Sequence, residues 1–342
     1  MSEKKKITIS RIADTAQVSI ATVSRLLNNT GYVRPETKKK ILAAMDALDF
    51  HPQDIDSFES THSILVCFPN FRNPFNHDII AGIHSAAAAR NYRPFYYEAS
   101  DLNEELSNYE SILKRHHFSG IILVHNVVDL DLLENLRRRY PIVMCSEHCD
   151  HPAVSFVSID DNIAAQNAVN HLITIGRTKI AFINSMLIHN YAKHREKGVL
   201  AALKHAGLSL NLNWITHITD IDFDMAVSAA TSMLSMPERP NAFFCVSDVY
   251  AAAVIKAART LGLSVPEDVA VVGFDNTDLA TMTVPSLTTI NQPSFQIGQQ
   301  SCDILINLIE NPETSVKHVI LNTDLIVRGS TTIPFPRKSP IF

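Results

Sequence analysis

The sequence contains no run of about 18 uninterrupted apolar residues, which is the length that a membrane-spanning helix requires. Its beginning, MSEKKKITIS, lacks the apolar segment of a secretory signal peptide. The five cysteines are an odd number without a C-x-x-C pair, which is typical of proteins in a reducing compartment. These absences predict a cytoplasmic protein that does not span a membrane.

Glycine is scarce, at 10 of 342 residues, and the usual catalytic motifs are missing. The sequence has no P-loop, no G-x-G-x-x-G turn, no G-x-S-x-G and no H-E-x-x-H. The segment CSEHCDH at residues 145–151 gathers cysteine and histidine, but C-x-x-x-C is not an established zinc spacing. A loop after a strand explains it better than a metal site does. We therefore expect no cofactor and no bound metal.

The chain has a hydrophobic content of 46% and a charged content of 19%, and both values are typical of a well-packed globular protein. A length of 342 residues favours two or three folding units. The net charge of −5 hides an asymmetry, because residues 1–50 carry nine Lys or Arg against five Asp or Glu. A basic head on an acidic body indicates that only the head binds a polyanion.

Three segments of the head carry apolar side chains at helical spacing: Ile12, Ala13 and Ala16; Val23, Leu26 and Leu27; and Ile41, Leu42, Met45 and Leu48. Thr8 and Ser19 are suited to cap the first two helices, and Pro35 suits the first turn of the third. Only residues 17–19 separate the first two helices, so these helices must cross steeply.

The second helix is predicted to present a narrow, hydrogen-bonding face that contains Ile20, Ala21, Thr22, Ser24, Arg25 and Asn28. Small side chains let a helix approach a surface closely, and Arg and Asn bond to base edges in a major groove. The third helix would contact phosphates through Lys38, Lys39 and Lys40. The alternative is a solvated face on a structural domain, but the three-helix pattern, the short turn and the basic balance favour DNA.

Residues 8–50, TISRIADTAQVSIATVSRLLNNTGYVRPETKKKILAAMDALDF, resemble the helix-turn-helix head of the lactose-repressor (LacI/GalR) family. The resemblance implies that Ile20, Ala21 and Arg25 read bases. It also implies contacts with the DNA backbone from Thr8, Ser19, Thr22, Ser24, Asn28, Tyr32 and Thr37. The chain departs from the family at Gln17, where the family has a turn glycine, and at Arg11, where it has aspartate.

Residues 51–61 correspond to the family's hinge, P-N-x-x-A-x-x-L, whose leucine opens a minor-groove base step. The alanine and leucine positions are Asp56 and Glu59 here, and phosphates would repel both. Ile55 or Phe58 would be the wedge if the register slips. An acidic linker that never enters the groove is the other interpretation, and both stay open.

From residue 62 the chain alternates apolar strands with helical segments. The expected strands are 63–68, 93–98, 120–125, 141–145, 156–159, 179–184, 242–247 and 269–274. Helices are expected to begin near residues 74, 103, 131, 163, 193, 224, 248 and 295. Uninterrupted apolar strands between helices indicate parallel sheets covered on both faces, and such sheets bind ligands beyond the carboxyl ends of their strands.

This region also resembles the LacI/GalR family, in segments such as NPFNHDIIAGI, GIILVHN and VAVVGFDN. The resemblance implies an all-α helix-turn-helix domain at 1–50, a hinge at 51–61, and an α/β effector-binding and dimerisation domain at 62–342. The implied fold of this last domain is the two-lobed periplasmic-binding-protein type I fold with three crossovers. Lobe one is expected at about 62–160 and 293–322, and lobe two at about 161–292 and 323–342.

Candidate effector contacts lie at strand ends and adjoining loops: Phe75, Asn76, His125, Ser146, Glu147, Arg195, Phe223, Ser247, Asp248, Asp275 and Gln292. By resemblance, Arg195 and Asp275 would grip vicinal hydroxyls, and Phe223 would stack on a sugar or base ring. Asp248 is also expected to be a helix N-cap. Many relatives have Asp where Ser146 stands, which predicts a different hydroxyl pattern or a cationic group in the ligand.

Together these features predict a ligand-responsive transcriptional repressor that binds a near-palindromic DNA operator as a homodimer. The effector would be sugar-like, or a nucleoside, and dimer contacts are expected near residues 79–89. A solute-binding protein is one rival, which the missing signal peptide and the basic head disfavour. An enzyme acting on a sugar or nucleoside is another, with Asp275 and His125 as its one candidate acid–base pair. We expect that the protein is a regulator and not an enzyme.

Overall fold

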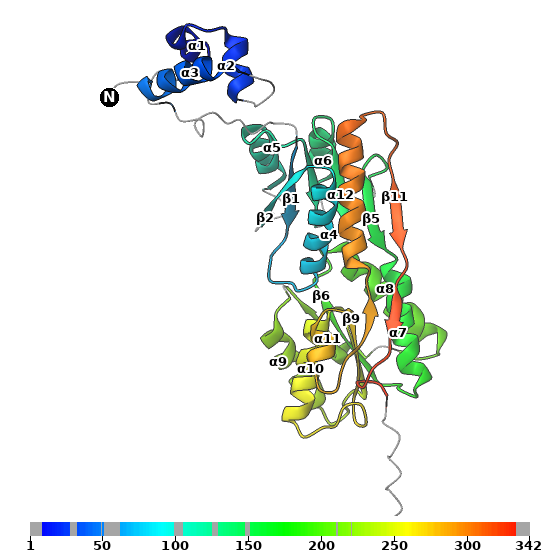
Figure 1. Cartoon of the computed structure of the whole chain (residues 1–342). Coiled ribbons are helices and arrows are strands. Elements are labelled where there is room, and N and C mark those ends of the chain that lie inside the picture. Colours follow the sequence, from blue (N-terminus) through cyan, green and yellow to red (C-terminus); the bar gives the residue numbers. More distant parts are fainter. Residues whose placement is uncertain are drawn as a thin grey trace, which may run out of the picture. The chain divides into compact units, whose positions relative to one another are not determined.

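The computed structural model describes residues 9–27, 33–48, 50, 62–98, 105–124, 129–147, 151–209, 211–219 and 221–332. The chain divides into two compact units, Met1–His62 and Ser63–Phe342, and we describe each by itself. Three helices form the described secondary structure of the first unit, and strands alternate with helices in the second (Figure 1).

The head is formed by three short helices, α1 (Ile9–Ala16), α2 (Ile20–Leu27) and α3 (Pro35–Ala47). Its core consists of almost fully buried side chains from all three predicted apolar faces, among them Ile12, Ala13, Val23, Ile41 and Met45. The predicted three-helix head is therefore confirmed. Leu42, predicted to face the core, is instead 44% exposed, because α3 turns its Ile41 side toward α1.

The turn between α1 and α2 is tight, as the short link predicts. Gln17 has a φ of 53°, in the left-handed region that favours glycine. Its N–H donates to the carbonyl of Asp14 at 3.3 Å. Ser19 accepts the N–H of Thr22 on its Oγ at 3.2 Å and so caps α2 as predicted. Pro35 stands in the first turn of α3, also as predicted.

The second unit contains two six-stranded sheets. The first, of order β11-β5-β4-β3-β1-β2, is parallel throughout and contains β1 (Ser63–Phe68), β2 (Arg93–Glu98), β3 (Gly120–Leu123), β4 (Ile142–Cys145), β5 (Ser155–Ile159) and β11 (His318–Leu321). The second, of order β12-β10-β9-β8-β6-β7, contains β6 (Ile180–Ser185), β7 (Ile215–Ile218), β8 (Ala242–Cys245), β9 (Ala270–Asp275), β10 (Thr288–Asn291) and β12 (Asp324–Ile326). Only β12 runs antiparallel to its neighbour.

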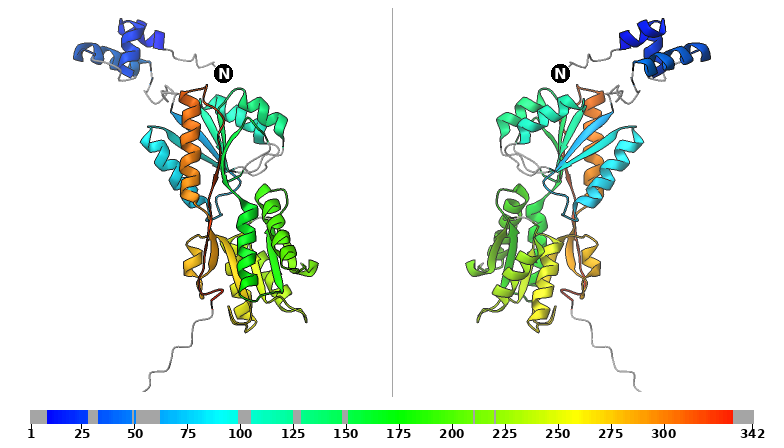
Figure 2. Two further views of the ribbon diagram at one scale, coloured as in Figure 1. Left: turned by 90° about the vertical axis from the view of Figure 1, so that its right-hand side faces the viewer. Right: turned by 90° about the vertical axis from the view of Figure 1, so that its left-hand side faces the viewer.

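Helices cover both faces of the first sheet (Figure 2). In β1, Ile64 and Val66 belong to the core that includes α4 (Asn76–Ala89) and α12 (Ser294–Glu310). The alternate residues, Leu65 and Cys67, belong to the core under α5 (Glu105–Arg115) and α6 (Leu130–Arg137). Because successive strand residues point to opposite faces, the sheet is buried on both sides, as its uninterrupted apolar strands predict.

The second sheet is covered in the same manner (Figure 2). Here α7 (Asp161–Thr174) packs against α8 (Asn190–His205), and α9 (Phe223–Leu234) packs against α10 (Asp248–Thr260). A short helix, α11 (Leu279–Met282), follows β9, and a 3₁₀ turn (Leu212–Trp214) precedes β7.

The chain passes between the two sheets three times, after β5, after β10 and after β11. As a result α12 and β11 complete the first sheet, although they follow the whole of β6 to β10 in sequence. The predicted two-lobed α/β fold with three crossovers is confirmed.

Candidate functional site

The surface of α2 carries the side chains that were predicted to read bases. Ile20 is 54% exposed, Ala21 and Arg25 are exposed as well, and Val23 on the opposite side is fully buried. The helix is therefore anchored through one face and open on the other. Short side chains such as isoleucine and alanine let the helix come close to base edges, and the neighbouring guanidinium can donate hydrogen bonds to them. This arrangement suits a DNA major groove.

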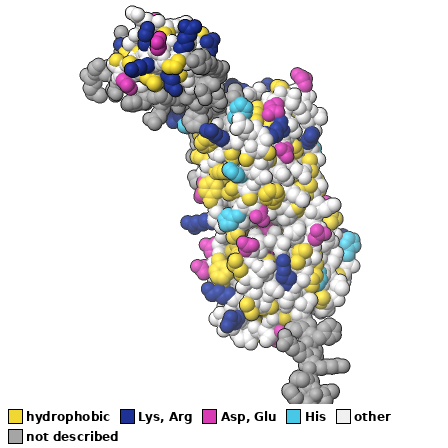
Figure 3. All heavy atoms as spheres, in the orientation of Figure 1, with side chains coloured by type: hydrophobic (Ala, Val, Ile, Leu, Met, Phe, Trp, Pro, Cys, Tyr) yellow, Lys and Arg dark blue, Asp and Glu magenta, His cyan; other side chains and the backbone are white. Residues whose placement is uncertain are grey.

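Hydroxyl and basic side chains flank this face. Ser19 Oγ and Thr22 Oγ1 lie 2.7 Å apart, and Ser24 and Thr37 are half-buried. Three consecutive exposed lysines follow in α3, namely Lys38, Lys39 and Lys40. Figure 3 shows several Lys and Arg side chains on the surface of the head. These cations supply the positive surface that contact with a polyanion requires.

Several predicted contacts lie outside the described residues. These are Thr8, Asn28, Tyr32, Ile55 and Phe58 for DNA, and His125 for the effector. Both interpretations of residues 51–61 fall there as well.

In the second unit, Arg195 lies at the centre of a buried polar cluster. It extends from α8, and its Nε donates to Asp161 Oδ1 at 2.8 Å while a terminal nitrogen donates to the Val246 carbonyl at 2.7 Å. The guanidinium carbon lies 3.5 Å from the ring centroid of Phe274. With a residue exposure of 5%, this arginine is held by protein groups on several sides.

Asp275 stands at the carboxyl end of β9, where its φ of 110° turns the chain. Its Oδ1 accepts a hydrogen bond from Gln292 Nε2 at 2.7 Å. Burial raises the pKa of Asp275 well above its ordinary value, and the positive charge of Arg195 acts in the opposite direction. The structure thus places the two strongest candidates in one cluster, but Arg195 donates to Asp161, which the sequence pattern does not single out.

The predicted N-cap of α10 is wrong by one residue. Ser247 is the cap, since its side chain accepts the N–H of Tyr250 at 3.2 Å, and Asp248 is already inside the helix. The Asp248 carboxylate instead accepts Thr289 Oγ1 at 2.6 Å and the N–H of Thr277 at 2.7 Å. Burial raises the pKa of Asp248 to about 6, although these hydrogen bonds favour its ionised form. Asp248 therefore ties helix α10 to the segments that follow β9 and form β10.

The first sheet contributes residues that follow β1 and β4. Asn76 opens α4 and donates from Nδ2 to the Asn70 carbonyl at 2.9 Å, and Phe75 before it is buried. Ser146 has a φ of 67°, and next to it Glu147 is only 6% exposed. The backbone of Tyr191, at the start of α8, lies close enough to the Glu147 carboxyl group to lower its pKa, against the rise that burial causes, so the strand ends of the two sheets meet here.

Phe223 begins α9 and is half-buried against the core. Lys256 Nζ lies 5.1 Å from the centroid of its ring. The ammonium group of Lys256 therefore lies within cation–π distance of the Phe223 ring.

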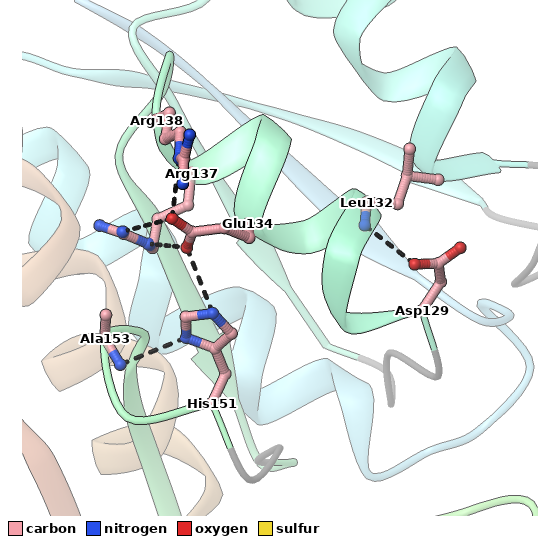
Figure 4. A network of polar contacts seen from close by, with 7 residues as sticks. All are labelled: Asp129, Leu132, Glu134, Arg137, Arg138, His151 and Ala153. Atoms are coloured by element: carbon pink, nitrogen blue, oxygen red, sulfur yellow. Dashed lines mark hydrogen bonds and ion pairs between the residues drawn. The ribbon is translucent and has the colours of Figure 1, made fainter.

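His151, from the segment CSEHCDH, takes part in a different network (Figure 4). Its Nδ1 accepts the N–H of Ala153 at 3.2 Å, and its Nε2 lies 3.2 Å from Glu134 Oε2. Hydrogen bonds from Arg137 and Arg138 lower the pKa of Glu134 to about 2. Among the described residues, no group of three or more His, Cys, Asp or Glu side chains is arranged to hold a metal. Residues 148–150 of the segment lie outside that description.

Fold and site together define a DNA-binding head joined to a two-lobed domain with a polar cluster where its sheets meet. Sequence comparison agrees with this class: a model of the bacterial regulatory proteins of the lacI family matches residues 8–53. A model of the periplasmic binding protein-like domain matches residues 169–331.

The transcriptional repressor CytR of Escherichia coli (strain K12) is 30% identical over 338 residues, which is 97% of this chain and 99% of that protein. The repressor PurR of Photobacterium profundum is also 30% identical, over 94% of this chain and 98% of that one. This chain belongs to the LacI family of bacterial transcriptional regulators. It is a DNA-binding transcriptional repressor and not an enzyme.

Solved structures agree with the fold. An uncharacterised protein from Actinobacillus succinogenes is 35% identical with a TM-score of 0.74, and the match covers 80% of this chain and 100% of that one. The transcriptional regulator CelR, solved in complex with cellobiose, is 26% identical with a TM-score of 0.71, over 95% of this chain and 100% of that one. In the described part of this chain, no helix has the length and apolar character to cross a membrane.

Proposed function

We propose that this repressor acts in the cytoplasm as a homodimer on a near-palindromic double-stranded operator, with α2 of each subunit in the major groove. The observation that carries the proposal is the open face of α2, where Ile20, Ala21 and Arg25 stand exposed opposite the buried Val23. Arg25 would donate to a guanine, and Ile20 with Ala21 would meet thymine methyl groups. Phosphates would be neutralised by the exposed lysines of α3, Lys38, Lys39 and Lys40.

The homodimer contact is proposed on α4, within residues 79–89. One face of α4 packs so closely on α12 that a Cβ on Gly82 would lie 2.1 Å from the Phe295 carbonyl oxygen. The opposite face is exposed and carries His84 among small side chains, Ala81, Ser85, Ala88 and Ala89. Two copies related by a two-fold axis would bury this same face on each subunit.

A small-molecule effector, either sugar-like or a nucleoside, is proposed to bind where the strand ends of the two sheets meet. The polar cluster around Arg195 supplies donors and acceptors there, and the solved relative CelR holds cellobiose. The other proposed contacts are the residues nearest those strand ends: Phe75, Asn76, Ser146, Glu147, Phe223, Ser247, Asp248, Asp275 and Gln292. His125 is proposed with them, although it lies outside the described residues.

The contacts also suggest how the effector would alter DNA binding. Gln292, which donates to Asp275, lies on the segment that leaves the second sheet and enters α12. Two residues on, Ser294 Oγ donates to Asp78 Oδ2 of α4 at 3.3 Å. An effector that binds one angle between the lobes better than another would therefore move the proposed dimer helix and change how the heads are presented to DNA.

The test of the DNA-reading role compares Arg25→Ala with Lys39→Ala in operator selection and salt titration. Arg25→Ala should cost about 1–3 kcal/mol and relax preference at one base position. Lys39→Ala should weaken binding to all DNA sequences alike. It should also reduce the slope of the logarithm of the binding constant against the logarithm of salt concentration by about 1. An unchanged base preference in Arg25→Ala would remove that residue from the proposed reading set.

A further inference from the structure

Glu147 is a buried acid with an unused hydrogen-bonding atom. It follows β4 directly after the left-handed Ser146, and only 6% of its surface is exposed. Burial raises the pKa of its carboxyl group overall, although the positive charges of Arg195 and Lys193 and the backbone of Tyr191 all act to lower it. Its Oε1 is fully buried and has no hydrogen-bond partner among the residues that the structure describes. A buried polar atom without a partner is costly, so an unmet acceptor here calls for an explanation.

The groups that act on Glu147 are the carboxylate of Asp161, the guanidinium of Arg195, the ammonium of Lys193 and the backbone of Tyr191 at the start of α8. Among the buried side chains of this cluster, carboxyl groups outnumber cations. Arg195 already donates to Asp161, and Lys193 is an exposed side chain whose Nζ lies 3.3 Å from an amide oxygen of Asn190. The nearby Asp275 adds a further buried carboxyl group, which accepts from a neutral amide.

An anionic ligand would find no free buried cation in the described part of this cluster, because Arg195 already pairs with Asp161, and burying an unpaired charge is costly. The unpartnered Oε1 of Glu147, in contrast, can bond to a donor from the ligand. We propose that the effector is an uncharged or cationic molecule, a polyol or an amine, that donates a hydrogen bond from a hydroxyl or amino group to Glu147 Oε1, and that ligands carrying phosphate or carboxylate groups are excluded. This inference rests on the proposed effector site and adds the chemical class of its ligand.

The same geometry couples ligand binding to a proton. Burial raises the pKa of Glu147 to about 8, with the charge of Asp161 adding to the shift, so the ligand-free site holds a proton at neutral pH. A hydroxyl or ammonium donor bonds more strongly to the ionised carboxylate than to the neutral acid, so a ligand that donates to Glu147 favours loss of that proton. Effector affinity should therefore rise with pH, by up to about tenfold per unit below the pKa, and level off above it.

The experiment is a thermal-shift screen of the full chain with matched compounds: glucose, glucosamine, glucose 6-phosphate and glucuronate, and ribose, adenosine and cytidine with their 5′-phosphates. A neutral or amino member should raise the Tm, and its phosphorylated or carboxylated partner should not. A larger shift with the anionic member would overturn the inference and leave the effector site standing. If no compound shifts the Tm while the chain still binds operator DNA, the proposed effector site fails, and the inference fails with it.

The role of Glu147 is then tested with the compound found. In Glu147→Gln the affinity should fall and its rise from pH 6 to pH 8 should flatten. Glu313→Gln, which changes an exposed glutamate in the same way, should keep both properties of the unaltered chain. An unaltered pH profile in Glu147→Gln would show that the ligand does not bond to this carboxyl group.

Discussion

Arg195 and Asp161 form a buried ion pair that links two helices, since Nε of Arg195 in α8 donates to Oδ1 of Asp161 in the first turn of α7 at 2.8 Å. Their side chains are 6% and 3% exposed. Such a pair is strongly interdependent, because removal of one partner leaves the other charge buried alone. The pair holds the guanidinium in place before any ligand arrives.

Asp161→Asn should therefore destabilise the second unit by about 3 kcal/mol, the scale for breaking a buried pair. Urea unfolding followed by the fluorescence of Trp214, the single tryptophan and a buried residue of this unit, measures the effect. The control is Glu110→Gln, which breaks the exposed contact with Arg139 and should cost less than about 1 kcal/mol. Equal costs for the two variants would contradict the structural role of the pair.

Asp275→Ala should abolish the response to effector and leave the DNA affinity of the ligand-free chain nearly unchanged. The reason is that Asp275 contacts Gln292 and the cluster around Arg195, whereas the DNA-reading face belongs to the other unit. Operator binding with and without the effector is the measurement. Asp324→Ala, an exposed aspartate on β12, is the matched control and should respond normally. A normal response in Asp275→Ala would place this residue outside the ligand's reach.

Gln17→Gly should stabilise the turn between α1 and α2 by about 1 kcal/mol, the usual cost of a left-handed non-glycine residue. The φ of 53° at Gln17 is the source of the strain. Amide hydrogen exchange of α1 and α2 in the full chain should slow accordingly. Gln17→Ala, which changes the side chain and keeps the Cβ, should give no such protection; slower exchange in that variant would point to a side-chain cause.

The stability of the second unit should fall as the pH rises from about 5 to about 8, because raised acid pKa values make the folded chain hold more protons than the unfolded one. The pKa of Glu147 is about 8 and that of Asp248 about 6, and burial is the main cause of both shifts. Each group lowers the free energy of unfolding by up to about 1.4 kcal/mol per pH unit in its range. Urea midpoints at pH 5 and pH 8 should differ less in Glu147→Gln than in Glu313→Gln.

Much of the fold follows from local pattern. The bounds predicted for 63–68 and 93–98 match β1 and β2, because a fully or partly apolar strand between helical segments has few alternatives. The pattern does not predict β7, β10, β11 or β12. The last two are edge strands with two of four residues exposed in β11 and one of three in β12, and β10 reads TTIN, so none of these three shows a buried apolar run.

The polar cluster is harder to predict, because its contacts join residues far apart in the sequence. Asp161 and Arg195 are 34 positions apart, and adjacent to Asp161 stands Asp160, which caps α7 and has the same side chain. Nothing local distinguishes a cap from a partner of a buried arginine. The burial of Glu147 likewise depends on α8 lying over the end of β4, which only the assembled sheets bring about.

The three passages of the chain between its sheets bear on how the protein is made. The helix α12 and the strand β11, which complete the first sheet, lie at residues 294–321 and leave the ribosome only after β6 to β10 have been made. Until then the faces of β3, β4 and β5 that α12 covers stay without it. A prematurely terminated chain that lacks α12 would therefore expose the apolar faces of these strands. Such exposed surface is prone to aggregate and is recognised by chaperones and proteases.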